Sequence, residues 1–175
     1  MKKLDQPHYW AIWVAIAAFI ADQASKNWLL YGLQLKDDPR IIDLFPSFSL
    51  VMVWNRGVSF GLFNHQENQE INRWVLSLVG VVMVGVIVFW LKQVQTKWPA
   101  IAGGLIIGGA LGNVLDRLIH GAVADFFDFY IGTWHWPAFN IADACITVGV
   151  AIILLQEFVR LPMQGKKNSN SEEKS

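Results

Sequence analysis

Charged and amide side chains interrupt long apolar segments at several points of this 175-residue sequence. They are Asp22 and Lys26 near the end of the first segment, Asn113, Asp116 and Arg117 near the end of the third, Asn140 and Asp143 opening the fourth, and Asp125 and Asp128 between those two. A charge at the centre of a membrane helix costs about 2.5 to 3.5 kcal/mol. Asp143, one turn inside an apolar run with no basic neighbour in sequence, therefore indicates a functional role.

These residue types favour chemistry that is carried out by carboxylates. The four histidines are scattered, at positions 8, 65, 120 and 135, and neither a His-Glu-x-x-His motif nor a Gly-x-Ser-x-Gly motif occurs. Cys145, the one cysteine, has no obvious partner base. We therefore expect no metal and no cofactor. Asp125 and Asp143 are the best-placed pair, and of two close carboxylates one keeps its proton while the other accepts one from water.

The elements that carry these residues are apolar enough to lie in a bilayer. Hydrophobic residues make up 54% of the chain and charged residues 16%, with nine Trp and eleven Phe. About 20 apolar residues span a membrane as a helix. The sequence thus predicts an all-α membrane protein, one domain over 1–164, with four transmembrane helices at about 10–30, 74–91, 101–119 and 141–159.

The first apolar segment has a second interpretation. Lys2 and Lys3 precede it and Ala15-Ile16-Ala17 resembles a cleavage site, as in a removable signal peptide. Its cleavage would discard Asp22 and Lys26, whose i, i+4 spacing predicts a structural pair near the helix end. Alternatively, Asp22 and Lys26 are interfacial residues whose charged groups extend to the lipid headgroups.

Basic residues near the segment ends predict the orientation. They gather at the N-terminus, between the second and third segments and after the fourth, which predicts that both termini are cytoplasmic. In this orientation the polar residues named above all lie near the outer ends of the spans. The Lys-, Asn-, Ser- and Glu-rich stretch 165–175 predicts a disordered cytoplasmic tail. A net charge of zero gives no electrostatic case for nucleic acid.

Two further patterns concern how the spans are connected and packed. Alternation around Phe48–Val53, within the mixed stretch 41–60, predicts a small β-structured platform in the first loop, on the outer face. Glycines at 104, 108 and 112 form a small-residue stripe along the third segment. Because the run lacks the Gly-Lys-Ser/Thr ending of a phosphate loop, it predicts close helix packing.

Five blocks, in order along the chain, resemble the signature blocks of lipoprotein signal peptidase, or signal peptidase II. They are Asp22-Gln23-Ala24-Ser25-Lys26, Asn55-Arg56-Gly57-Val58-Ser59-Phe60, the run from Gly108 to Arg117, Val123-Ala124-Asp125-Phe126-Phe127-Asp128-Phe129, and Phe139-Asn140-Ile141-Ala142-Asp143. Val58-Ser59 replaces the two alanines of many relatives, a conservative departure.

The resemblance implies an intramembrane aspartyl endopeptidase of the bacterial cytoplasmic (inner) membrane. Its substrate would be a diacylglyceryl-modified prolipoprotein held in membrane lipid, cut on the amino side of the lipidated cysteine, and globomycin would inhibit it. The family's catalytic aspartates correspond to Asp125 and Asp143. Its other important polar positions correspond to Asp22, Lys26, Asn55, Asn113, Arg117 and Asn140.

Two other classes of protein compete with a peptidase. A transporter or proton channel would use carboxylates at the membrane midplane, whereas here they gather near one face and leave no polar path to the other. A scaffold protein explains the glycine stripe but not the paired aspartates.

Overall fold

The computed structural model describes residues 6–57 and 69–172, with side chains described as far as Phe158. The elements are α1 (Gln6–Asn27), a π-helical turn η1 (Trp28–Gly32), β1 (Ile42–Phe45), β2 (Phe48–Asn55), α2 (Gln69–Leu91), α3 (Lys97–His120), β3 (Val123–Ile131), β4 (Trp134–His135) and α4 (Ile141–Glu172). Lys2, Lys3, His65 and the block residues Val58, Ser59 and Phe60 lie outside the described part.

Three described helices are long and apolar enough to cross a membrane. They are α2, α3 and the Ile141–Phe158 part of α4, with mean hydropathies of 2.6, 1.5 and 1.8. Helix α1 has 22 residues but is not among the three. The mostly helical fold is therefore confirmed, while the fourth span stays a prediction.

Helix α3 is the centre of the helical bundle and packs against α1, α2 and α4. Its glycines permit this contact: a Cβ on Gly104 would lie 2.5 Å from the Ala11 carbonyl oxygen of α1, and one on Gly108 would collide with the Ala15 carbonyl oxygen. Gly109 faces α4 in the same way, with the Ala142 carbonyl oxygen 2.5 Å from such a Cβ. The predicted packing role of the stripe is confirmed.

A four-stranded antiparallel sheet in the order β1-β2-β3-β4 lies at one end of the bundle. Strands β1 and β2 come from the first connection, as predicted. Strands β3 and β4, which the sequence did not predict, come from the connection between α3 and α4 and extend the same sheet. Buried Leu50 and Phe126, with Leu29 and Leu35, form the core that holds this sheet on the end of α1.

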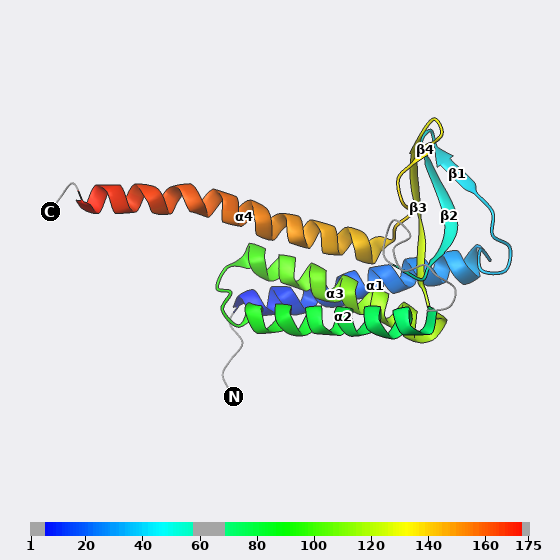
Figure 1. Ribbon diagram of the computed structural model, residues 1–175, viewed down its shortest axis with the longest axis horizontal. Helices are drawn as coiled ribbons and strands as arrows, with labels where there is room; N and C mark the ends of the chain where they lie inside the picture. Colours follow the sequence, from blue (N-terminus) through cyan, green and yellow to red (C-terminus); the bar gives the residue numbers. More distant parts are fainter. Residues whose placement is uncertain (1–5, 58–68, 173–175) are drawn as a thin grey trace.

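The start of α1 and the end of α4 lie at the end of the molecule opposite the sheet (Figure 1). In the same view α4 diverges from the other helices and continues beyond them. Its helical backbone runs to Glu172 and so enters 165–175, where the sequence predicts disorder. The helix therefore does not end at the predicted boundary of the tail.

Candidate active site

Asp125 lies on β3, and its side chain is 1% exposed. Asn55, at the end of β2, donates from Nδ2 to Asp125 Oδ2 at 3.0 Å, and Asn140 Nδ2 donates to Oδ1 at 2.7 Å. The antiparallel register pairs Val53 with Asp125 and so brings the end of β2 to this carboxyl. Both oxygens of a nearly inaccessible acid are thus held by amide donors.

Asp143 lies in the first turn of α4, and Asn140 precedes that helix. The Asp143 backbone N–H donates to Asn140 Oδ1 at 2.9 Å, and the Asn140 backbone N–H donates to Asp143 Oδ2 at 3.3 Å. This reciprocal arrangement is a capping box, which satisfies two backbone donors at the start of a helix. It also fixes the direction of the Asp143 carboxylate.

Two asparagines join the aspartates. Asn113 of α3 donates from Nδ2 to Asp143 Oδ1 at 2.8 Å. Asn140, which is fully buried and already bonded to Asp125, also donates to Asn113 Oδ1 at 3.2 Å. A single amide network therefore connects both carboxyl groups, although they come from a strand and a helix.

The pKa of Asp125 is raised from its ordinary value of 3.8 to about 7. Burial, which penalises the charged form, is the larger cause, and the negative charge of Asp143 is the second. The hydrogen bonds from Asn55 and Asn140 act in the opposite direction. A carboxyl group that keeps its proton near neutral pH, beside a second carboxylate, is the arrangement required for general acid–base chemistry.

A buried charged cluster supports the site from α1. Lys26 Nζ lies 2.8 Å from Asp22 Oδ2 and 2.9 Å from Asp116 Oδ2, and it donates to Asn113 Oδ1 at 3.3 Å. Asp22 Oδ1 in turn accepts the Ala142 backbone N–H at 2.9 Å. The cluster therefore links α1 to α3 and to the start of α4, and it contacts the amide network through Asn113.

The sequence predicted the Asp22–Lys26 contact but not the rest of this cluster. Asp116 and Gln23 complete the cluster, since Gln23 Nε2 donates to both Asp22 and Asp116 at 3.1 Å. Asp116 also accepts the Ala124 backbone N–H at 3.1 Å, next to Asp125. The spacing of three between Asn113 and Asp116, one helical turn, is the signal that both face α1.

Two other polar residues differ in their relation to the amide network. Arg117 is half-buried, donates to the Asn113 carbonyl at 3.2 Å and interacts electrostatically with Asp143 and Asp125. Asp128, by contrast, pairs with His135 Nδ1 at 2.8 Å across the β3–β4 hairpin. The site therefore includes Arg117 but not Asp128.

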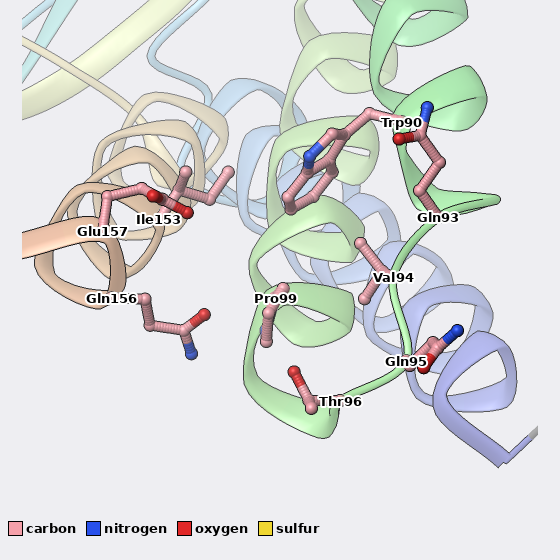
Figure 2. A pocket seen from close by; sticks show the side chains of 9 residues that line it. All are labelled: Trp90, Gln93, Val94, Gln95, Thr96, Pro99, Ile153, Gln156 and Glu157. Atoms are coloured by element: carbon pink, nitrogen blue, oxygen red, sulfur yellow. The ribbon is translucent and has the colours of Figure 1, made fainter. Parts of the chain in front are cut away.

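Two clefts of the described part lie away from the aspartates. One, of about 490 Å³, is lined by aromatic and other residues of the sheet tip, including Phe129, Trp134 and Trp136. The other, of about 370 Å³, lies between α2 and α4 at the far end of the bundle (Figure 2). Among the described residues, no group of three His, Cys, Asp or Glu side chains has the geometry to hold a metal ion.

Solved structures with the same fold define the class to which this architecture belongs. One bacterial membrane enzyme, determined by the in meso method at 2.3 Å resolution, matches with a TM-score of 0.70 and 23% identity, covering 85% of this chain and 87% of its own. A second, at 1.9 Å, matches with a TM-score of 0.68 and 25% identity over 83% and 90%. This fold is therefore one that bacterial membrane enzymes adopt.

Sequence comparison gives the particular family. The family model for signal peptidase (SPase) II matches residues 14–159. A lipoprotein signal peptidase of Vibrio cholerae is 39% identical over 92% of this chain and 91% of its own length, and one of Shewanella loihica is 44% identical over 84% and 85%. This chain belongs to the signal peptidase II family, and it is therefore a hydrolase, a protease of the aspartic type.

Proposed function

We propose that this protein removes signal peptides from diacylglyceryl-modified prolipoproteins, cutting on the amino side of the lipidated cysteine, with Asp125 and Asp143 as its catalytic pair. The observation that carries the proposal is the Asn140 bridge: its amide donates to Asp125 while the same residue is reciprocally bonded to Asp143. Family membership and relatives named lipoprotein signal peptidase support the substrate class.

The proposed mechanism of peptide hydrolysis depends on one proton that Asp125 and Asp143 share. The ionised carboxylate removes a proton from a water molecule, whose oxygen attacks the scissile carbonyl carbon, while the protonated carboxyl donates a hydrogen bond to the carbonyl oxygen. Collapse of the tetrahedral intermediate breaks the C–N bond, and the leaving amine takes a proton from the pair. Because the two groups titrate together, the proton belongs to the pair rather than to one residue.

The neighbouring residues position the reacting groups. Asn55 and Asn113 each hold one carboxylate oxygen, and Asn140 holds both groups. Arg117 offers donors to the substrate backbone, whose carbonyls lack water partners at membrane depth. Asp22 and Lys26 brace α1 against this assembly through the buried cluster.

The setting is the bacterial cytoplasmic membrane, with four spans, both termini cytoplasmic and the active site near the outer face. The diacylglyceryl chains keep the substrate in lipid, since each buried methylene adds about 0.8 kcal/mol of membrane affinity. The apolar, largely exposed surfaces of α2 and α4 support contact with that lipid. Globomycin, the inhibitor implied by the motif resemblance, is proposed to bind the same site.

Conversion of a diacylglyceryl-prolipoprotein to its shortened form by purified protein in detergent tests this function. Asp125→Asn and Asp143→Asn keep the size of the side chain but remove its proton acceptor, so each is expected to abolish turnover while globomycin binding persists. The double variant should be little worse than either single one, because the pair acts as a unit.

Two results would contradict the proposal. One is near wild-type turnover by either single variant. The other is loss of cleavage in EDTA with recovery on adding zinc, because the carboxylate mechanism uses no metal.

A further inference from the structure

An apolar row of side chains on β3 leads from Asp125 to the tip of the sheet. Side chains alternate between the two faces of a strand, so the face that carries this carboxyl also carries Phe127, Phe129 and Ile131. The irregular step in the β2–β3 pairing has its extra residue in β2, so the alternation in β3 is not interrupted. Exposure rises from 1% at Asp125 to 48% at Phe129 and 75% at Ile131. The row therefore leads from a buried acid to an exposed apolar end.

This face of β3 is turned toward the start of α4. Asp125 accepts a hydrogen bond from Asn140, which immediately precedes α4. The Phe129 ring stacks on that of Phe139, with 6.0 Å between the two ring centroids. The opposite face carries Phe126, which belongs to the core that holds the sheet on the end of α1. The apolar row therefore lies on the side of the sheet that faces α4.

The orientation of the sheet brings the end of this row over the lipid. In Figure 1 the strands run across the direction of the helices, and the β3–β4 end of the sheet extends beyond α4. If the helices cross the bilayer as proposed, the strands lie along its outer surface. The face that carries the apolar row is then turned toward the lipid beside α4.

A cleft of about 490 Å³ lies at the exposed end of this row. Phe129 and Ile131 line it together with Trp134, Trp136 and Phe139, and within the described part of the chain its lining contains no charged side chain. Pockets of about 300 to 1,000 Å³ accommodate groups of the size of a small molecule. Since a charged or strongly polar group would lose its water here without gaining a partner, the lining favours a hydrocarbon chain.

The distance between the cleft and Asp125 matches the reach of the substrate's lipid. The four residue steps from Asp125 to Phe129 cover about 13 Å along the strand. In a diacylglyceryl cysteine the first ester carbonyl is about seven bonds from the nitrogen of the scissile peptide bond, or about 9 Å when extended. The first methylenes of an acyl chain therefore reach Phe129, and the following ones reach the cleft.

We propose that the cleft at the tip of the sheet binds one acyl chain of the substrate's diacylglyceryl group, and that the row from Phe127 to Ile131 directs this chain away from the scissile bond. The inference rests on the proposed function and deepens it, because it assigns the lipid of the substrate to a particular surface. An acyl chain in a membrane is already out of water, so the cleft gains from packing against aromatic rings rather than from the hydrophobic effect. Its main effect is to orient the lipidated cysteine at the aspartates.

Photolabelling tests the contact directly. Full-length Asp125→Asn, which is expected to bind the substrate without cutting it, is mixed in detergent with a diacylglyceryl-prolipoprotein that carries a diazirine in the first half of one acyl chain. After irradiation, peptide mapping by mass spectrometry is expected to find the label within residues 129–139. Phosphatidylglycerol with the same group, at the same mole fraction, is the control for ordinary membrane contact. Equal labelling by this lipid, or substrate label confined to the helices, would overturn the proposal.

Acyl-chain length tests whether the contact contributes to catalysis. Two diacylglyceryl-prolipoproteins with the same peptide, one with palmitoyl and one with butanoyl chains, are assayed in detergent for kcat and KM. The enzymes are full-length wild type, Ile131→Gln and Trp136→Gln. Phe45→Gln is the matched control, because Phe45 is 69% exposed on β1 and does not line the cleft.

Wild type is expected to prefer the palmitoyl substrate about three- to tenfold in kcat/KM, through KM, as packing contacts of a few methylenes allow. Both cleft variants should reduce that preference, and Phe45→Gln should keep it. Equal cleavage of the two substrates by wild type would overturn the role of the cleft and leave the proposed function intact. The same holds for a preference that all variants keep, since it would reflect only partition of the chains into the micelle. Cleavage of neither substrate by wild type would overturn the proposed function itself.

Discussion

In the proposed mechanism, the protonation of Asp125 links stability to activity. Its pKa is raised to about 7 by burial and by the charge of Asp143. A carboxyl whose pKa is raised on folding contributes stability that is fully present below its unfolded value, near 4, and is lost as the pH rises through about 7. The folded protein therefore favours the protonated form that the proposed mechanism requires.

Asp125→Asn is accordingly expected to change the pH dependence of stability. Asparagine does not titrate, so the stability of the variant relative to wild type should increase between pH 5 and pH 8, by on the order of 2 to 4 kcal/mol. Thermal unfolding in detergent at both pH values measures this difference, and a pH-independent difference would contradict it. Wild-type turnover should also fall as the pH rises above about 7, because the shared proton is lost.

Lys26 is the residue on which the buried cluster depends. Lys26→Met leaves both Asp22 and Asp116 without their cation and should destabilise the protein by about 3 to 5 kcal/mol. Asp22→Asn should cost less, because Lys26 still pairs with Asp116. Unfolding in detergent compares them, with Lys36→Met as the control, since exposed Lys36 should change stability by less than about 0.5 kcal/mol.

The same variants test the bracing role of this cluster. Activity should fall together with stability, because Lys26 contacts Asn113, which holds Asp143. A fully stable Asp22→Asn protein with no turnover would instead place Asp22 among the catalytic residues.

At the scale of elements, the α1–α3 interface depends on glycine. A Cβ at Gly108 would collide with the Ala15 carbonyl oxygen and lie 2.8 Å from Ala18 Cβ, whereas one at Gly85 of α2 meets nothing within 4 Å. Gly108→Ala should therefore destabilise the protein by about 1 to 3 kcal/mol, through overpacking. Gly85→Ala should be neutral or slightly stabilising, by up to about 1 kcal/mol, because alanine favours the helix. Equal unfolding temperatures for the two variants would contradict this packing.

The elements differ in how far the sequence predicts them. Long apolar runs predict α2, α3 and the start of α4, and alternation predicts β2. Alternation of polar and apolar residues does not predict β3, because Val123–Asp128 is almost continuously buried. Its pairing strand, β2, also lies about 70 residues earlier in the chain. Partners that are distant in the sequence are likewise not predicted for the site residues. The sequence indicates which polar side chains lie at the same depth in the membrane, but not that Asn140 bridges Asp125 to Asp143.

At the scale of the whole molecule, the start of α1 and the end of α4 lie opposite the sheet (Figure 1). If α1 spans the membrane as proposed, alkaline phosphatase fused after Ser175 stays in the cytoplasm and is inactive. The same reporter inserted at Gly132, in the β3–β4 turn, should be active outside. An active fusion after Ser175 would contradict the topology and, with it, the common outer depth of the polar residues.

The site is also drawn from the whole length of the chain. Asn55 comes from the first connection, Asn113 from α3, Asp125 from β3 and Asp143 from the last helix. A ribosome that has produced the chain only as far as the end of β3 has therefore made Asp125 without Asp143, and a strand without Asn140, the residue that caps α4. If Asp125 and Asp143 are the catalytic pair, as proposed, hydrolysis begins only after the start of α4 has left the ribosome and joined the bundle. Unfinished copies of the enzyme thus pass through the membrane insertion machinery as inert proteins, among the very precursors that the finished copy cuts.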